Sequence, residues 1–407
     1  MRNDIPKPLI PIMGKPVIVH EIECLKKQGF TDYIITVGFK AEQITNCLGD
    51  GKSLGVNIEY FKESEPLGNA GALTYLKKQL TDTFILVNAD LMFDVDINQM
   101  LYFHIIKNAS ATILTHPNSH PYDSGLIEVN NNNAVIEWIN KEDNRNKFYK
   151  NRVNAGIHII SKELIPDKLN GKLDLDRDIL KPLSGSGKIF AYDSTEYVKD
   201  MGTPERYDIV TKDALAGKIA QKNLANKQKA IFLDRDGTIN KYVGFLNNID
   251  EFELIPGIAE SIKKINDSGY LAIVITNQPV IARGELSFNG LTAIHNKMET
   301  LLGSEGAYID GIYFCPHHPD KGFANEISDL KIDCMCRKPK PGMLFNAAKD
   351  YNIDLLQSWM IGDGGNDIMA GKAAGCRTIL IDNDGEWGQD YTVDSLSQAI
   401  DVIIERM

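Results

Sequence analysis

Two carboxylates two residues apart, Asp234 and Asp236, follow an apolar run in the segment Ala-Ile-Phe-Leu-Asp-Arg-Asp-Gly-Thr. If the run is a strand, side chains at i and i+2 point to the same side, and its carboxyl end is where open α/β sheets place their sites. One carboxylate can then be a nucleophile and the other an acid and base, with a hard cation between them. The pattern indicates phosphoryl transfer to an aspartate. The alternative is a polar strand end followed by a turn.

The sequence after this pair supplies, in order, the other groups that a phosphotransfer site needs. Thr276 and Asn277 end another apolar run, and their hydroxyl and amide can hydrogen-bond a phosphoryl oxygen. Lys338 offers an ammonium that would neutralise the phosphoryl group and the nucleophile together. Asp363 ends a further run and would complete, with the first two aspartates, a carboxylate site that suits Mg²⁺. Asp367 would orient the lysine or the ion.

A cysteine-rich stretch lies just before Lys338. Three of the six cysteines of the chain, Cys315, Cys334 and Cys336, fall close together and form Cys-x-His and Cys-x-Cys pairs with a histidine. Four such ligands predict a structural zinc site that holds the loop carrying the lysine. The spacing favours His317 as the fourth ligand, although His318 is the alternative. A few buried thiols beside a surface histidine would be the bland interpretation.

The chain of 407 residues exceeds the usual size of one core, so we expect two domains. Apolar β-rich runs alternate with amphipathic stretches, which predicts two α/β units. A polar, lysine-rich stretch at 216–228 lacks a hydrophobic period and is predicted to link domains at 1–215 and 229–407, after a helix from Pro204. The expected strands are 33–37, 84–87, 153–160, 231–233, 271–275, 312–314, 359–361 and 378–381.

The charge balance and the apolar pattern exclude several classes of partner. The formal net charge of -11 disfavours nonspecific binding to nucleic acid or to acidic membranes. No apolar run approaches the length of a transmembrane helix, and the start of the sequence has no signal-peptide pattern. We therefore expect a cytoplasmic protein without a nucleic-acid or membrane partner. The oligomeric state stays open.

The motifs around Asp234 resemble those of the haloacid dehalogenase superfamily of phosphohydrolases, over roughly residues 228 to 405. The resemblance implies a Rossmann-like domain and catalysis with Mg²⁺ through an aspartyl-phosphate on Asp234. Asp236 would protonate the leaving sugar oxygen and then deprotonate the hydrolytic water.

Within that superfamily the chain resembles the D-glycero-D-manno-heptose 1,7-bisphosphate phosphatases and the related histidinol-phosphate phosphatases. The resemblance implies that Arg283 and Arg337 hold the distal phosphate or the sugar, a task that suits a forked guanidinium. One departure is Pro279-Val280, where the family has Ser-Gly; proline removes a backbone N–H, which leaves the substrate open. The matching segments are 232–240, 276–278, 281–284, 315–319 and 336–339.

A second set of motifs resembles the sugar-1-phosphate nucleotidyltransferases, especially the mannose- and heptose-1-phosphate guanylyltransferase branch, over roughly residues 1 to 215. This resemblance implies a mixed sheet with flanking helices. It also implies that Asp90 and Asp200 share Mg²⁺, which would bridge the nucleoside triphosphate and the attacking sugar phosphate. The motifs are Pro-Lys-Pro at 6–8, Leu-Gly-Asn-Ala-Gly at 67–71, Val-Asn-Ala-Asp at 87–90, Asn-Ala-Gly at 154–156 and Lys-Asp-Met-Gly-Thr-Pro-Glu at 199–205.

The same resemblance implies roles for five further residues of this domain. Lys7 would contact phosphate. Gly68 and Gly71 would let the backbone approach the base or sugar closely. Asn154 and Gly156 would contact the sugar.

The family also has a strand and a Gly-x-Gly-Thr-Arg loop upstream of the Pro-Lys-Pro segment. Because Met1 lies five residues before Pro6, we expect both to be absent and nucleotidyl transfer to be impaired. A start site placed too far downstream would give the same sequence. A noncatalytic domain that binds a sugar nucleotide or acts as a scaffold is the alternative.

Together the two resemblances predict a two-domain α/β enzyme of nucleotide-activated heptose synthesis. One domain would remove the 7-phosphate of the heptose bisphosphate, and the other would join heptose 1-phosphate to a nucleotide, with GTP as the expected donor. A histidinol-phosphate phosphatase is the closest rival, and the fused sugar domain argues against it. A nucleic-acid 3′-phosphatase is disfavoured by the acidic balance.

Overall fold

The protein is described from a computed structural model, which covers residues 5–169 and 171–406. The backbone contacts divide the described residues into two units. Unit 1 comprises Met1–His116, Ile127–Asn140 and Val153–Asn223; unit 2 comprises Pro117–Leu126, Lys141–Arg152 and Leu224–Met407. Unit 2 thus takes in two segments of the N-terminal half. The predicted domain borders at residues 215 and 228 stay predictions. The predicted loss of a strand concerns the chain before Pro6, and residues 1–4 lie outside the described residues.

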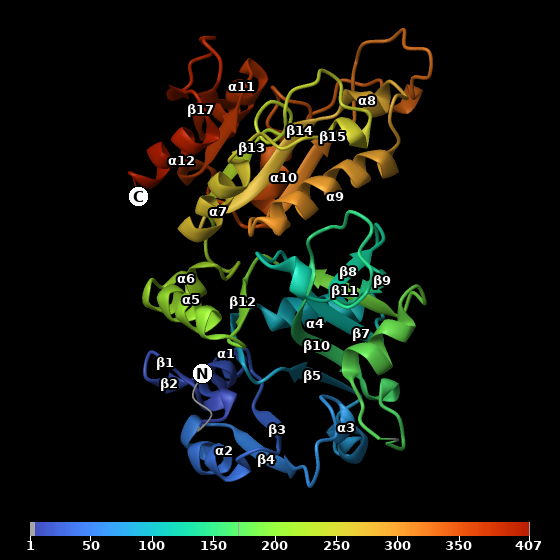
Figure 1. The fold of residues 1–407 in the computed structure, drawn as a ribbon, viewed down its shortest axis with the longest axis vertical. Helices are drawn as coiled ribbons and strands as arrows, with labels where there is room; N and C mark the ends of the chain where they lie inside the picture. The colour runs from blue at the N-terminus through green and yellow to red at the C-terminus, as the bar shows by residue number, and fades with distance from the viewer. Residues whose placement is uncertain (1–4, 170, 407) are drawn as a thin grey trace. The chain divides into compact units, whose positions relative to one another are not determined.

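Unit 2 is built on a six-stranded parallel sheet with the order β15-β14-β13-β16-β17-β18. β13, β14 and β15 lie side by side in Figure 1. The strands are β13 (Ala230–Leu233), β14 (Leu271–Asn277), β15 (Gly311–Cys315), β16 (Trp359–Gly362), β17 (Arg377–Ile381) and β18 (Tyr391–Val393).

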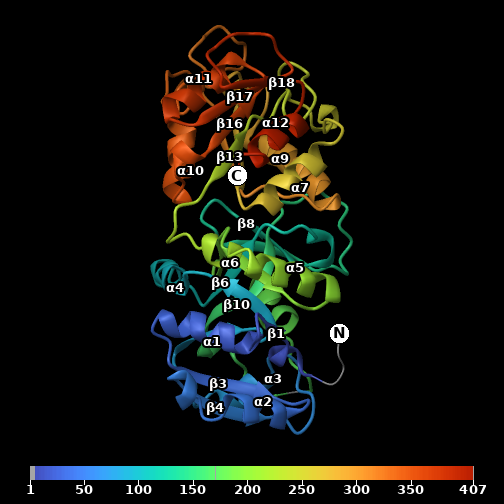
Figure 2. The same cartoon turned by 90° about the vertical axis from the view of Figure 1, so that its left-hand side faces the viewer.

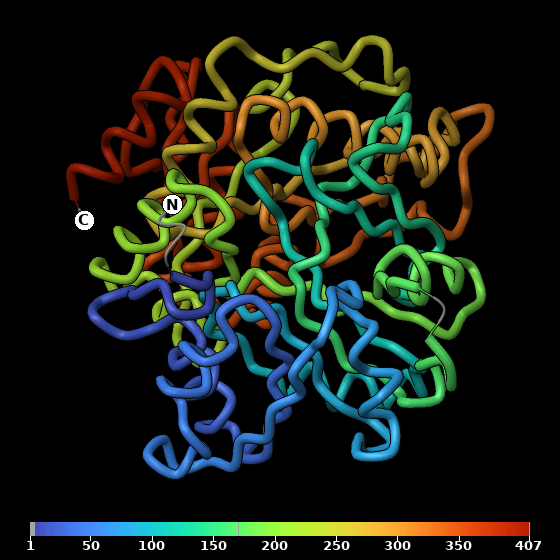
Figure 3. The backbone as a smooth tube through the Cα atoms, turned by 60° about the horizontal axis from the view of Figure 1, so that its bottom comes forward, coloured from blue at the N-terminus to red at the C-terminus, as the bar shows by residue number. Residues whose placement is uncertain are grey.

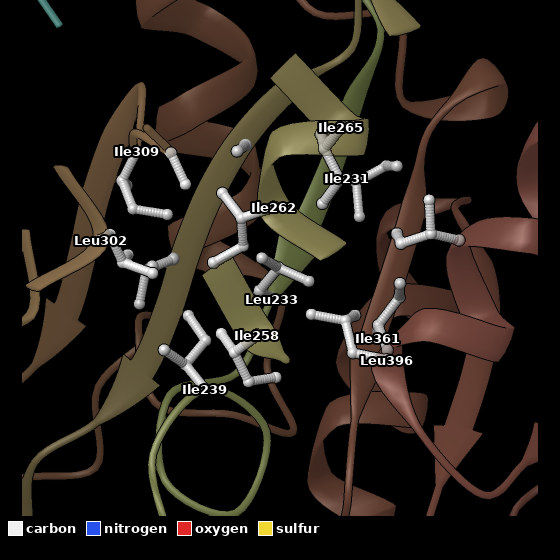
Figure 4. Packing of buried hydrophobic residues seen from close by; sticks show 14 of the residues in the cluster. Ile231, Leu233, Ile239, Ile258, Ile262, Ile265, Leu302, Ile309, Ile361 and Leu396 are labelled. Atoms are coloured by element: carbon white, nitrogen blue, oxygen red, sulfur yellow. The ribbon is translucent and has the colours of Figure 1, made fainter. Parts of the chain in front are cut away.

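Both faces of this sheet are covered by helices, which explains why its strands read as continuous apolar runs. Ile231 and Leu233 of β13 pack with α7 (Ile258–Ser268), α9 (Phe288–Ser304) and α12 (Leu396–Ile404). The alternate residues Ala230 and Phe232 pack with α10 (Gly342–Asp350) and α11 (Gly365–Ala374), on the opposite side of the sheet in Figure 2. Figure 4 shows the first cluster around the fully buried Ile262.

This packing is the main support of the site described below. Truncating Ile262 to alanine would cost about 2–5 kcal/mol of folding free energy, because the surrounding helices and strands cannot close the cavity fully. The remaining short helices of unit 2 are η3 (Pro121–Asp123), η7 (Ile249–Glu251), α8 (Pro279–Ala282), η8 (Ser328–Leu330) and η9 (Leu355–Gln357).

Unit 1 is a mixed α/β structure. Its six-stranded sheet has the order β11-β7-β10-β8-β9, and β5 also pairs with β10. β10 is antiparallel to both β5 and β7, whereas β11 and β7 are parallel. The strands of this sheet are β5 (Thr83–Val87), β7 (Ala111–His116), β8 (Leu126–Val129), β9 (Val135–Ile139), β10 (Val153–Ser161) and β11 (Ile189–Asp193).

Three two-stranded pairs complete the strands described in unit 1. Figure 3 traces the backbone, with the N-terminal residues in blue and the C-terminal residues in red. The pairs are β1 (Pro11–Ile12) with β2 (Lys15–Pro16), β3 (Asp32–Val37) with β4 (Asn57–Lys62), and β6 (Leu91–Asp94) with β12 (Tyr197–Asp200). The helices are η1 (Lys7–Leu9), α1 (Val17–Lys27), α2 (Ala41–Leu48), η2 (Lys52–Leu54), α3 (Gly71–Leu76), α4 (Ile97–Ile106), η4 (Lys162–Leu164), η5 (Leu175–Leu180), η6 (Lys181–Leu183), α5 (Pro204–Leu215) and α6 (Lys218–Gln221).

The predicted fold class, α/β with two different sheets, is confirmed. The sequence predicts that residues 216–228 form a polar linker that does not pack in a core, and the structure differs. The stretch contains α6, and Ile219 is buried against Met201 and Val210. Lys222 and Gln228 of the same stretch are buried as well, and burial of two polar side chains does not show as a hydrophobic period. Across residues 5–169 and 171–406 we find no helix with the length and apolar character of a membrane span.

Candidate active site and metal centres

Asp234 stands directly after β13, at the carboxyl end of the central strand of unit 2. Its backbone N–H donates to Ile361 O of the neighbouring strand at 3.0 Å. The Lys338 ammonium donates to Asp234 Oδ1 at 2.7 Å and to Ile275 O at 2.7 Å, and lies 2.5 Å from Asp367 Oδ1. Since the lysine side chain is only 3% exposed, its charge is fixed beside Asp234 by three oxygens from three different segments.

A group of carboxylates surrounds this ammonium. Oxygens of Asp234, Asp363 and Asp367 all lie within 4.8 Å of one another. Gly237 makes the approach of Asp363 possible, because a Cβ built on Gly237 would lie 2.0 Å from Asp363 Oδ2, and its φ of +88° also favours glycine. Oxygen donors of this charge fit a hard divalent cation such as Mg²⁺. Asp367 is engaged by the lysine and by Gly364 N at 3.1 Å, so Asp234 and Asp363 are the freer ligands.

The ionisation of these groups reflects their burial and their charged neighbours. Burial raises the pKa of Asp234 to about 7, against the lowering effect of Lys338. Burial and then the charge of Asp234 raise the pKa of Asp363 to about 6. Burial alone would lower the pKa of Lys338, but Asp234 and Asp367 outweigh it and leave the pKa above its ordinary value. The lysine is thus held in its charged form, whereas burial favours the protonated form of the two carboxyls.

Asp236 lies outside this carboxylate group. Its Oδ1 accepts from Arg235 Nη2 at 2.9 Å and from Asn240 Nδ2 at 3.0 Å. Its Oδ2 accepts from Arg235 Nη2 and from Gln278 Nε2, both at 2.8 Å. The side chain is therefore held beside the nucleophile as a candidate acid and base, and the structure gives it no place among the clustered cation ligands.

Thr276 and Asn277, at the end of β14, make different contacts. Thr276 is buried, and its Oγ1 accepts from Gln278 Nε2 at 2.9 Å. The Asn277 side chain exchanges two hydrogen bonds with the backbone of Lys338: its Nδ2 donates to Lys338 O, and its Oδ1 accepts from Lys338 N, both at 3.0 Å. Asn277 therefore fixes the lysine-bearing loop in this structure.

The predicted soft ligands gather into a second metal-binding group. Cys315, His317, Cys334 and Cys336 each offer one ligand atom, and these atoms all lie within 4.8 Å of one another. The Sγ atoms are 3.2 to 3.4 Å apart, and His317 Nδ1 is 3.3 Å from Cys336 Sγ. His318 is outside the group, and its Nδ1 accepts instead from Asp320 N. Four protein ligands of this kind fit a structural zinc ion.

The predicted substrate arginines lie around the zinc loop. Arg283 is sandwiched between two aromatic rings, with its guanidinium carbon 3.7 Å from the centroid of Phe245 and 4.5 Å from that of Phe323. Arg337 Nη1 donates to the carbonyl of His317 at 3.3 Å. Lys331 adds a buried ammonium 4.4 Å from the Phe323 ring. Sequence reasoning missed both rings and Lys331, since none of the three lies in one of the motifs.

In unit 1 the structure brings Asp90 and Asp200 near one another through pairing of β6 and β12. Asp200 is the register partner of Leu91, and Met201 N donates to Asp90 O. Lys7 Nζ lies 3.6 Å from Asp90 Oδ2. The Asp200 carboxylate accepts from Arg206 Nη1 at 2.9 Å, so it is engaged more closely than the Asp90 carboxylate, which lies 3.6 Å from the Lys7 ammonium.

The predicted glycines of unit 1 serve close packing within the chain. A Cβ on Gly68 would lie 2.3 Å from Leu173 O, on Gly71 2.6 Å from Leu67 Cβ, and on Gly156 2.7 Å from the Asn88 amide. In all three the space that a Cβ would need is therefore filled by protein atoms. Asn154 donates to Asp176 Oδ2 at 3.1 Å.

One buried acid of unit 1 was not predicted. Glu21 of α1 accepts from Leu91 N at 3.0 Å and so braces the turn that carries Asp90. Burial raises the pKa of Glu21 well above its ordinary value. The two contact partners are 70 residues apart, and no local pattern in the sequence signals such a contact.

Comparison with known proteins assigns both units. The nucleotidyl transferase family matches residues 2–215, and the HAD-hydrolase-like family matches residues 335–399. The D-glycero-beta-D-manno-heptose-1,7-bisphosphate 7-phosphatase of Pasteurella multocida is 42% identical over 178 residues, which are 42% of this chain and 94% of that protein. The alpha-anomer 7-phosphatase of Burkholderia mallei is 42% identical over 155 residues, 38% of this chain and 80% of that protein.

A solved structure adds a further similarity. The D,D-heptose 1.7-bisphosphate phosphatase from B. bronchiseptica, complexed with magnesium and phosphate, is 30% identical, with a TM-score of 0.39 over 44% of this chain and 100% of that chain. The two family matches and the identity to the heptose-bisphosphate phosphatases confirm the family resemblances predicted from the motifs. The chain belongs to the nucleotidyl transferase family in its N-terminal half and to the HAD-like phosphatases in its C-terminal half.

Proposed function

We propose that unit 2 removes the 7-phosphate of D-glycero-D-manno-heptose 1,7-bisphosphate, with Mg²⁺ as cofactor. The observation that carries the proposal is the buried Lys338 ammonium, which joins the nucleophile Asp234 to Asp367 and fixes a positive charge where a phosphoryl group would arrive. The similarity of the whole C-terminal part to heptose-bisphosphate phosphatases supports the substrate.

In this proposal the residues act in two steps. Asp234 attacks phosphorus, and the bond between phosphorus and the sugar oxygen breaks as Asp236 gives that oxygen a proton. An aspartyl-phosphate is left on Asp234. Asp236 then takes a proton from water as the water oxygen attacks phosphorus, which releases phosphate and restores Asp234. Bound Mg²⁺, held by Asp234 and Asp363, would neutralise the phosphoryl oxygens.

The zinc loop would supply substrate recognition. We propose a zinc ion on Cys315, His317, Cys334 and Cys336, which would hold the loop whose next residues are Arg337 and Lys338. Arg283, stacked between two rings, would present its guanidinium to the distal phosphate or sugar.

We further propose that unit 1 transfers a nucleotidyl group, with GTP as donor, to the heptose 1-phosphate that unit 2 releases. The match to the nucleotidyl transferase family supports the reaction class, and Asp90 with Lys7 supports a site at the end of β5. The product of one unit would be the substrate of the other. Such an enzyme would act in the cytoplasm, in the synthesis of activated heptose for surface polysaccharides.

Phosphate release from both anomers of the heptose bisphosphate and from histidinol phosphate tests the phosphatase proposal. We expect kcat/KM to be higher by at least about 100-fold for a heptose bisphosphate, because histidinol phosphate lacks the second phosphate that the arginines would bind. A preference for histidinol phosphate would overturn the assignment of substrate.

A further inference from the structure

A buried pair of side chains lies behind Asp236 and has no part in the two steps given above. Arg235 is completely buried and donates three hydrogen bonds to the Asp236 carboxylate. Its Nη2 donates to both oxygens, and its Nε donates to Oδ1 at 3.2 Å. Its remaining terminal nitrogen, Nη1, lies 3.2 Å from Nε2 of His295 on α9. The chain of contacts therefore runs from the helix, through the guanidinium, to the candidate acid and base.

The direction of the hydrogen bond between Arg235 and His295 can be decided. A guanidinium has donors only, so His295 Nε2 must be the acceptor and the ring must carry its proton on Nδ1. Burial, and secondarily the charge of Arg235, hold the pKa of His295 well below its ordinary value, which keeps the ring neutral. The ring also packs against Phe314, with centroids 5.8 Å apart. His295 is thus a rigid neutral acceptor.

The opposite side of the Asp236 carboxylate is held as well. Asn240 Nδ2 donates to Oδ1, and Gln278 Nε2 donates to Oδ2. Both oxygens are therefore engaged, and their direction relative to Asp234 is set by the fixed guanidinium. Loss of His295 would remove the hydrogen-bond partner of Arg235 Nη1 and weaken the hold of the guanidinium, which supplies three of the five hydrogen bonds to the carboxylate.

We propose that His295 and Arg235 are positioning residues, which aim the Asp236 carboxylate at the leaving oxygen and so favour phosphate esters of poorly leaving alcohols. The inference rests on the proposed phosphatase function. A sugar alkoxide must receive a proton as its bond to phosphorus breaks, whereas p-nitrophenolate leaves without one. Correct aim of Asp236 therefore matters for the sugar ester and hardly at all for the aryl ester.

The test uses His295, because removal of the fully buried Arg235 would confuse positioning with folding. In the full-length protein with Mg²⁺, His295→Phe removes the acceptor but keeps a ring. His295→Gln offers an amide oxygen that can accept from Arg235 again. Met298→Ala, at a buried position one turn further along α9, disturbs the packing of the same helix without touching the guanidinium.

Release of the leaving group is measured in a single turnover, with protein in excess, so that only formation of the aspartyl-phosphate is observed. The substrates are the heptose bisphosphate and p-nitrophenyl phosphate. We expect His295→Phe to slow release of the sugar by about 10- to 100-fold while release of p-nitrophenolate changes by less than about 3-fold. His295→Gln should recover most of the sugar rate, and Met298→Ala should leave the ratio of the two rates unchanged.

Equal losses on both substrates, no loss on either, or a changed ratio in Met298→Ala would overturn the positioning role. Failure of the proposed substrate gives a different result, since the unaltered protein would then release no phosphate from the heptose bisphosphate. In that case histidinol phosphate, which is also an alkyl ester, takes its place in the comparison of rates.

Discussion

At the scale of single residues, Lys338 supplies the buried positive charge beside the carboxylates of the candidate active site. Its ammonium contacts Asp234 and Asp367 and is almost completely buried. Replacing it by Lys338→Gln would leave two buried carboxylates without their cation and the phosphoryl group without a fixed positive charge. We expect kcat for phosphate release to fall by at least about 100-fold.

The matched control for this variant is Lys340→Gln. Lys340 lies two residues further along the same loop and pairs with the exposed Asp333. It should keep the activity of the unaltered protein. Retained kcat in Lys338→Gln, or an equal loss in both variants, would show that the buried ammonium has no special role.

The raised pKa values of Asp234 and Asp363 predict how Mg²⁺ binding depends on pH. Because these pKa values are raised on folding, the folded protein without metal favours the protonated carboxyls. Their protonation stabilises the fold fully below the ordinary aspartate pKa, and this stabilisation is lost as the pH rises through about 6 to about 7. Mg²⁺ needs the ionised oxygens. The increase in melting temperature on adding Mg²⁺ should therefore grow between about pH 5 and about pH 8. An increase that is the same at both ends of this range would contradict the assignment of the ligands.

At the scale of elements, the loop between β15 and α10 joins the zinc ligands to the active site. Cys336 is followed directly by Arg337 and Lys338, and Asn277 ties the backbone of Lys338 to the end of β14. We expect Cys334→Ser to lose the zinc, to lower the melting temperature and to lower kcat by about 10- to 100-fold, because the lysine is no longer held in place. Metal analysis, thermal unfolding and phosphate release measure the three effects.

The control is Cys376→Ser, which changes a buried cysteine away from the loop. Full activity of Cys334→Ser without zinc would contradict the proposed role.

The strands that carry the sites could be predicted from the sequence alone. All eight predicted apolar runs lie within strands, and the two faces of β13 follow from its alternating contacts. Five of the runs belong to the parallel sheet of unit 2, and they are continuously apolar because that sheet is covered on both faces. Shorter strands with exposed positions, such as β9 and β18, were missed since their apolar signal is weak.

The contacts that complete the sites could not be predicted, because they are made between distant residues. Arg235 and His295 are 60 residues apart, and a lone histidine inside an amphipathic helix belongs to no motif. The ring contacts of Arg283 arise in the same way. The packing of Gly68, Gly71 and Gly156 also depends on such contacts: their motifs are visible in the sequence, but the atoms that exclude a Cβ at each position are not.

At the scale of the whole molecule, the chain joins two reaction classes, and the proposed reactions share an intermediate. The two can be separated by variants. Asp234→Asn should abolish phosphate release but leave unit 1 able to release pyrophosphate from GTP when heptose 1-phosphate is supplied, if unit 1 is active as proposed. Asp90→Asn should have the opposite effect. Loss of both activities in either variant, with the protein folded, would contradict the assignment of one site to each unit.

The covalent intermediate on Asp234 is the central claim, and one measurement tests it most directly. The protein is mixed with heptose bisphosphate and Mg²⁺, quenched within a turnover and treated with borohydride, which reduces an aspartyl-phosphate to homoserine. Mass spectrometry of the peptide that contains positions 234 and 236 then locates the change. We predict homoserine at position 234 only when substrate is present. Rapid phosphate release with an unmodified Asp234, or with the label at Asp236, would contradict the account.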